Sequence, residues 1–90
     1  MKTIWKFPLQ ITDWQDVSMP ANAEIISVDH QDGWLCMWAI VATYEPKVPR
    51  RIAIVGTGNP MPFMNKEKFI GTVQIPYNGT VLVWHVFESK

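Results

Sequence analysis

The chain has 90 residues, of which 48% are hydrophobic and 18% charged, and its eight basic side chains balance eight acidic ones. This length fits a single domain, residues 1–90, with a core of ordinary size and a surface poor in charge. The zero net charge argues against DNA as a partner, because sequence-independent DNA binding draws its affinity from a basic excess. A charge-poor surface favours self-association, so we expect a homo-oligomer.

The start of the chain does not resemble a signal peptide, since Met1-Lys2 precedes mixed side chains. The single cysteine, Cys36, lies in the most apolar run and can form no intrachain disulfide. The apolar runs are shorter than the roughly 20 residues that span a membrane. These features predict a protein of a reducing cytoplasm that has no membrane partner.

The first part of the chain reads as two short strands. Lys2 to Leu9 alternates in polarity, and Pro8 suits the end of a strand or the edge of a sheet. Thr12 and Gln15 have the spacing of a helix capping box, which predicts one helical turn at most. A second strand is expected from Gln15 to Met19.

A hairpin is predicted in the middle of the chain. Asp32-Gly33 is typical of a type I′ turn, which needs positive φ at both positions. Trp34 to Thr43, after the turn, is apolar on both faces, which is typical of an internal strand. Glu24 to His30, before the turn, should be a strand with one face formed by Ile26, Val28 and His30.

The last third of the chain repeats this pattern. Asn78-Gly79 predicts a second type I′ hairpin, and Val81 to Phe87 after it is apolar on both faces. The segment from Gly56 to Lys68 begins with too many glycines and prolines for a regular element. Two further strands are expected at Arg50 to Val55 and at Phe69 to Ile75, the latter with one face formed by Phe69, Gly71, Val73 and Ile75.

Together these runs predict an all-β fold, a small antiparallel meander of six to seven strands closed as a barrel or sandwich. No segment carries the apolar stripe of a helix. The runs from Trp34 to Thr43 and from Arg50 to Val55 are expected to be the two central strands of one sheet, and Val81 to Phe87 should also be internal.

The best candidate for a ligand contact is the turn Gly56-Thr57-Gly58-Asn59, together with Arg50 and Arg51 on the strand before it. Backbone amides in such turns can converge on an anion. The turn matches neither a dinucleotide-binding fingerprint nor a Walker A loop. Arg50 is roughly 20 Å from the turn along an extended strand, so a partner subunit would have to bring the two together. A purely structural turn remains the alternative.

Five tryptophans are more than a core of this size needs. Trp38 and Trp84 lie on predicted internal strands and are assigned to the core. Trp5, Trp14 and Trp34 lie near strand ends or turns, where an indole can stack on a base or anchor a protein partner. Of these, Trp14 and Trp34 are the candidate ligand-binding residues.

No catalytic residues, metal ligands or cofactor are predicted. His85 has no motif that names a nucleophile or a carboxylate partner, so it is interpreted as a hydrogen-bonded core or interface histidine. His30 lies near Asp29 and Asp32, but one cysteine and two histidines are too few for a regular zinc site. A non-enzymatic protein is expected.

Three stretches, MKTIWKFPL at the start, GTGNP in the middle and VLVWHVFE at the end, support a resemblance over nearly the whole chain. They resemble a family of short tailed-phage proteins of unknown function. The resemblance implies a phage accessory protein in the host bacterial cytoplasm, and such proteins often counteract host antiviral defence. It implies no role for any residue.

Three hypotheses follow from these observations, and an enzyme is the last of them, because the sequence shows no paired acids, no nucleophile motif and no metal set. In the first, the protein binds and sequesters a nucleotide-like signalling ligand, by aromatic stacking and by arginine or amide contacts to phosphate. In the second, it is a direct protein inhibitor of a host defence complex and docks through an apolar aromatic surface.

Overall fold

The computed structural model describes residues 1–62 and 67–89 and confirms an all-β chain. The segment from Gly56 to Lys68, expected to lack a regular element, lies partly outside the described residues, at positions 63–66. The described part contains no helix, and so none that could cross a membrane. Its seven strands are β1 (Lys2–Pro8), β2 (Trp14–Pro20), β3 (Glu24–Gln31), β4 (Trp34–Ala42), β5 (Lys47–Gly56), β6 (Lys68–Tyr77) and β7 (Thr80–Glu88).

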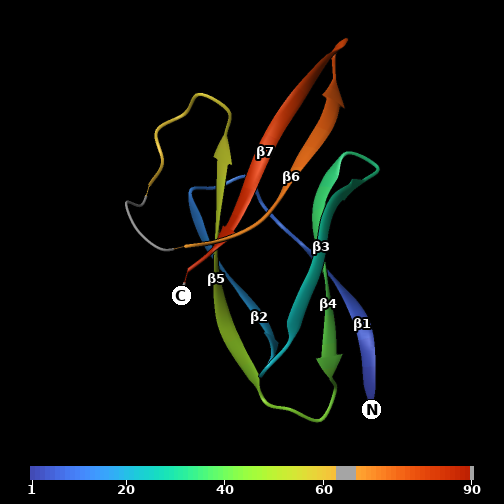
Figure 1. The fold of residues 1–90 in the computed structure, drawn as a ribbon. Coiled ribbons are helices and arrows are strands. Elements are labelled where there is room, and N and C mark those ends of the chain that lie inside the picture. The colour runs from blue at the N-terminus through green and yellow to red at the C-terminus, as the bar shows by residue number, and fades with distance from the viewer. Residues whose placement is uncertain (63–66, 90) are drawn as a thin grey trace.

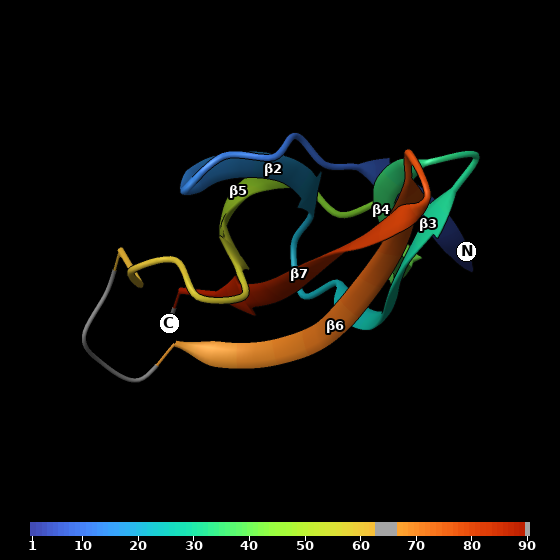
Figure 2. The same ribbon diagram turned by 90° about the horizontal axis from the view of Figure 1, so that it is seen from above.

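The strands form two antiparallel sheets that pack as an open sandwich and not as a closed barrel (Figures 1 and 2). Sheet A has the order β1-β4-β3, and sheet B has the order β2-β5-β7-β6. β4 and β7 are internal, as their two apolar faces predict. The expectation that β4 and β5 are the central pair of one sheet is wrong, because β1 and β3 occupy both edges of β4.

The topology is also not a simple meander. β1 pairs with β4, and β2 pairs with β5, so the first two strands of the chain lie in different sheets. The two predicted hairpin turns are confirmed, with φ of 53° and 83° at Asp32 and Gly33 and of 48° and 77° at Asn78 and Gly79. They join β3 to β4 and β6 to β7.

The link at Thr12, for which one helical turn at most is predicted, contains none. The side-chain Nε2 of Gln15 donates to the backbone carbonyl of Gln10 at 2.6 Å, and Oε1 of Gln15 accepts from the backbone amide of Gln10 at 3.1 Å. The Thr12 hydroxyl donates to the Trp14 carbonyl at 3.1 Å. These side chains fold the link into β2 as a bend, and strand pairing begins at Trp14.

Two β-bulges change which side chains face the core. The β3 register shifts between Ile25 and Ser27. As a result, Ile25 and Val28 both pack against the core, although simple alternation predicts that they lie on opposite faces of the strand. The β6 register shifts between Phe69 and Gly71, and Phe69 packs on Phe87 at 5.4 Å between ring centroids. The predicted faces of these two strands are therefore wrong at their first residues.

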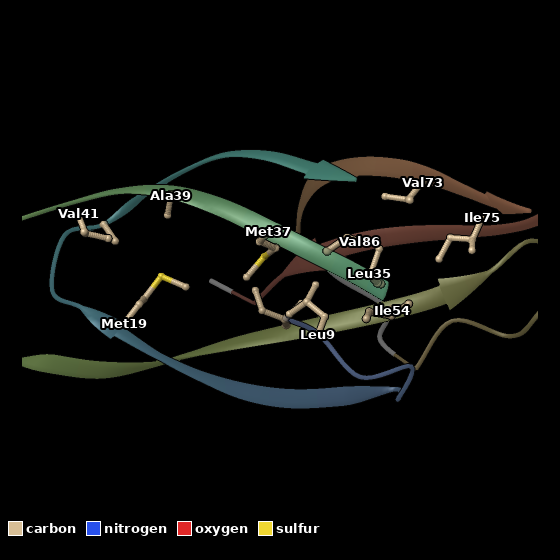
Figure 3. Close-up of a cluster of buried hydrophobic side chains, with 12 residues drawn as sticks. Leu9, Met19, Leu35, Met37, Ala39, Val41, Ile54, Val73, Ile75 and Val86 are labelled. Atoms are coloured by element: carbon tan, nitrogen blue, oxygen red, sulfur yellow. The ribbon is translucent and has the colours of Figure 1, made fainter. Parts of the chain in front are cut away.

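The core lies between the sheets (Figure 3). Sheet A contributes alternate β4 residues, and sheet B contributes one face of β5, β6 and β7; these side chains are Leu35, Met37, Ala39, Val41, Ile52, Ile54, Val73, Ile75 and Val86. Cys36 is also buried, but its place in the alternation puts it on the outer face of sheet A. The Lys6 ammonium on β1 donates a hydrogen bond to Oε1 of Gln31 on β3 at 2.7 Å. The Lys6 side chain therefore crosses the outer face of β4 near Cys36.

Candidate ligand site at the end of β5

β5 ends in a tight turn from Gly56 to Asn59. The Asn59 amide donates to the Gly56 carbonyl at 3.0 Å, and Gly58 has a φ of +86°, which L side chains rarely adopt. A Cβ at Gly56 would lie 2.7 Å from Nδ2 of Asn59 and 3.0 Å from Cζ3 of Trp84. Gly58 is thus required for its backbone angle, and Gly56 is required for close packing.

Thr57, inside this turn, is tied to two neighbouring strands through His85. Its Oγ1 lies 2.8 Å from Nε2 of His85 on β7, and Nδ1 of the same ring lies 2.9 Å from Oγ1 of Thr72 on β6. Each hydroxyl can donate or accept, so the network is satisfied by either neutral tautomer or by the protonated ring. His85 is hydrogen-bonded as expected, although it lies half-buried on the outer face of sheet B and not in the core.

A hollow of about 360 Å³ borders the turn on the side of the β1–β2 connection. Its walls include Ile11 to Asp13, the Gly56 and Asn59 ends of the turn, and Trp84. Among residues 1–62 and 67–89, no group hydrogen-bonds the Asn59 side-chain amide or the Asp13 carboxylate. The hollow therefore combines an aromatic ring with a carboxamide and a carboxylate that are open to a ligand, as small-molecule sites do.

The amides of the turn form a smaller anion site than expected. The Thr57 amide donates to the Val83 carbonyl at 3.3 Å, and the Asn59 amide donates within the turn. After Gly56 the turn has three backbone amides, those of Thr57, Gly58 and Asn59. Within the described part of the chain, only the Gly58 amide has no acceptor. Among the described residues, Asp13 is also the only charged residue that lines the hollow. Within the described residues, the turn therefore offers an anion one open backbone amide, that of Gly58.

Arg51 lies on the outer face of sheet B, as Thr57 does, but six residues earlier on β5, roughly 20 Å away. Its guanidinium carbon lies 4.8 Å from the centroid of the Trp14 ring, and its Nη1 lies 3.7 Å from a carboxylate oxygen of Asp16. Trp14 directly follows Asp13 in the chain. The Arg51–Trp14 stack therefore stands beside the rim of the hollow, not inside it.

Arg50 and Trp34 do not belong to this site. Arg50 points to the opposite face of β5, where it forms an ion pair with Glu88 and donates from Nη1 to the Ala23 carbonyl at 2.9 Å. Trp34 is 71% exposed and lies on the outer face of sheet A. The structure thus gathers the four turn residues and places Trp14 beside the hollow. Arg51 lies roughly 20 Å from Thr57 along β5, and Arg50 and Trp34 lie elsewhere.

The sequence does not predict four residues that lie at the site, namely Asp13, Thr72, Trp84 and His85. Nothing in the local pattern places the β1–β2 connection beside the end of β5; only the pairing of Trp14 with Ala53 does so. In the same way, Thr72 and His85 meet through the register of β6 and β7. The alternation of β7 does indicate that His85 and Trp84 face opposite ways.

The Thr57–His85 contact has the spacing of a nucleophile and its base. However, the second ring nitrogen meets the Thr72 hydroxyl, where Ser-His-Asp triads place a carboxylate that orients and stabilises the ring. In the part of the chain that the structure describes, no group of three or more His, Cys, Asp or Glu is placed to hold a metal. Among the described residues, the His85 ring therefore has a threonine hydroxyl on each nitrogen.

Comparison with known proteins gives a family without an assigned activity. The model of a domain of unknown function (DUF7352) matches residues 1–90, so the chain belongs to that family. No curated protein and no solved structure matches the chain.

Proposed function

We propose that this member of the DUF7352 family is a non-enzymatic binding protein for a nucleoside-like small molecule. The observation that carries the proposal is the hollow in which the Trp84 ring meets the open side chains of Asn59 and Asp13. Stacking of a base on an aromatic ring contributes about 1–3 kcal/mol. A carboxamide matches the paired donor and acceptor of a base edge, and a carboxylate accepts from an exocyclic amine.

The charges around the site suggest different places for the two parts of such a ligand, the nucleoside and the phosphate. The base and sugar fit inside the hollow, whose one charged wall residue in the described part of the chain is the acidic Asp13. Only the phosphate chain of an extended ligand reaches outward over the rim toward Arg51, which lies roughly 20 Å along β5 from Thr57 and stacks on the Trp14 ring. Since Arg51 is half-exposed and near Asp16, its contribution to phosphate binding is small, below about 1 kcal/mol.

Isothermal titration calorimetry with matched nucleosides and nucleotides, including cyclic and ADP-ribose-derived ones, tests this division. We expect Asn59→Ala to weaken binding of both forms at least tenfold. Arg51→Ala should weaken the nucleotide severalfold, remove its salt dependence and leave the nucleoside unchanged. Gln74→Ala, an exposed amide elsewhere on sheet B, is the control. The proposal is wrong if the wild-type protein binds none of these compounds, or if Asn59→Ala and Gln74→Ala behave alike.

The biological setting rests on the resemblance to short tailed-phage proteins. In that setting the protein acts in the bacterial cytoplasm and sequesters a nucleotide-like signal of host antiviral defence. Sequestration requires only tight binding, which fits a site without a triad carboxylate. Expression of the protein should then lower the free concentration of such a signal in defended cells, measured by mass spectrometry, and Asn59→Ala should abolish the effect.

The alternative is direct inhibition of a host defence complex. It is favoured by Trp34, which exposes 71% of its surface on a face without the ligand site. Under this alternative, Trp34→Ser abolishes protection of the phage while Asn59→Ala leaves it intact. The opposite pattern supports the nucleoside proposal.

A further inference from the structure

The outer face of sheet A carries a pattern of side chains that is independent of the ligand site. Its centre is the apolar row of β4, with Trp34 71% exposed and Trp38 and Ile40 half-buried; Ile4 of β1, 55% exposed, lies beside Ile40. An exposed apolar sheet face of this kind marks an interaction surface.

Charges of opposite sign flank this apolar row. β1 carries Lys2 and Lys6 along one side, and β3 carries Glu24 and Asp29 along the other. The Lys6 ammonium leaves its own margin, because it donates across β4 to Gln31 at 2.7 Å. In register, Glu24 lies level with Ile40, between the levels of the two lysines, and Asp29 lies level with Cys36. By strand position, the face therefore has a lysine margin, an apolar centre and a carboxylate margin.

We propose that this face is the interface of a homodimer with a two-fold axis parallel to β4. Rotation about that axis lays the lysine margin of one copy over the acidic margin of the other and keeps every residue at its own level along the strand. Trp38 and Ile40 then face their own counterparts. Each Glu24 faces Ile4 of the other copy, with Lys2 and Lys6 about 7 Å along the strand on either side, within reach of a lysine side chain. Lys6 exchanges its hydrogen bond to Gln31 for this contact.

The charge pattern also selects this axis over the other in-plane choice. A two-fold axis across the strands would lay lysines over lysines and carboxylates over carboxylates, and such opposed like charges are costly in an interface. Pairing through the free edge of β1 is disfavoured as well, because Lys2, Lys6 and Pro8 are the residue types that protect sheet edges. The second copy is therefore the occupant that this face fits.

The size of the face sets the expected affinity. Nine residues of β4 and three strands give a footprint of roughly 30 Å by 14 Å, on the order of 400 Å² per copy. Stable interfaces bury about 800 Å² per partner, so this dimer is weak and depends on concentration. We expect the monomer–dimer transition between about 10 and 500 µM by sedimentation velocity, with weaker association at high salt.

Charge reversal tests the geometry. Lys6→Glu should weaken dimerisation at least tenfold, and so should Glu24→Lys, because each places like charges across the interface. An equal mixture of the two variants should associate again, since one margin of the mixed pair is then complementary with reversed sign and the other is unchanged. Lys47→Glu, an exposed strand lysine of sheet B, makes the same charge change as a control. Circular dichroism and melting curves confirm that all variants are folded.

Four results would overturn the proposal. The first is a wild-type protein that remains monomeric to about 1 mM. The second is equal weakening by Lys6→Glu and Lys47→Glu, which would show a general charge effect. The third is two single variants that fail to associate when mixed although both are folded. Trp34→Ser adds a check of the apolar centre, and association that is unaffected by it places the interface elsewhere.

Discussion

At the scale of single residues, the turn after β5 depends on two glycines with different tasks. Gly58 has a positive φ in open space, whereas Gly56 has an ordinary φ and no room for a Cβ. A methyl group at Gly56 would press on Nδ2 of Asn59 and on the Trp84 ring, both of which face the hollow. The two positions should therefore respond differently to alanine.

We expect Gly56→Ala to cost ligand binding more than stability. The Asn59 side chain can swing away, so the free energy of unfolding should fall by only about 1 kcal/mol, but the displaced amide no longer meets the ligand. Gly58→Ala should lower the free energy of unfolding by about 1–2 kcal/mol through backbone strain. Urea denaturation and calorimetry measure the two effects. Equal loss of binding in both variants at unchanged stability would contradict this assignment.

The Thr57–His85–Thr72 network should be visible as stability. Thr57→Val and Thr72→Val each remove one hydrogen bond from the ring with little change in shape. Each should lower the free energy of unfolding by about 0.5–1.5 kcal/mol, the net value of a typical hydrogen bond. Ser18→Ala, an exposed hydroxyl on β2, serves as the control in urea denaturation. No difference from the control would show that the network contributes nothing net.

At the scale of the elements, adjacent arginines of β5 serve opposite faces. Arg50 donates Nε to one Glu88 oxygen and Nη2 to the other at 3.0 Å, and Nη1 to the Ala23 carbonyl. It therefore joins β5, the end of β7 and the entry to β3. Arg51 is exposed on the other face and stacks on Trp14.

Matched substitutions separate these two roles. Arg50→Met should destabilise the protein by about 2–4 kcal/mol, because it leaves the mostly buried Glu88 carboxylate without its partner. Arg51→Met should change stability by less than about 1 kcal/mol, since exposed ion pairs contribute little. Chemical denaturation measures both. Equal effects would mean that Arg50 does not join the two sheets.

The sequence predicts the elements better than their assembly. Alternation, paired apolar faces and the Asp-Gly and Asn-Gly turns place every strand to within a few residues, because these are local properties. The sheet to which β4 or β5 belongs depends on pairing between distant segments, which no local pattern encodes. The same limit explains the site: the Gly56–Asn59 turn is visible in the sequence, whereas its neighbours Asp13 and Trp84 reach it only through sheet register.

At the scale of the whole molecule, the sandwich is held close where β3 meets β6 (Figure 2). Both strands carry a β-bulge next to this contact, at Ile25/Ser27 and at Phe69/Gly71. A Cβ at Gly71 would lie 2.7 Å from Cγ2 of Val28, so the two sheets approach each other there without room for a methyl group. Bulges cannot be identified from alternation alone, which is why the predicted faces of these strands fail beside this contact.

This contact makes a coupled prediction. Gly71→Ala should destabilise the protein by about 1–3 kcal/mol, because Val28 is β-branched and cannot swing aside as a long side chain could. Val28→Ala alone should cost about 1–2 kcal/mol as a lost core contact. In the double variant the new methyl group occupies space that Val28 has vacated, so its loss of stability should be smaller than the sum of the two single losses by at least 0.5 kcal/mol or so. Urea denaturation of the four proteins measures this coupling directly. Strictly additive losses would show that β3 and β6 are not in contact at these residues, and the close approach of the two sheets would have to be assigned to another pair of strands.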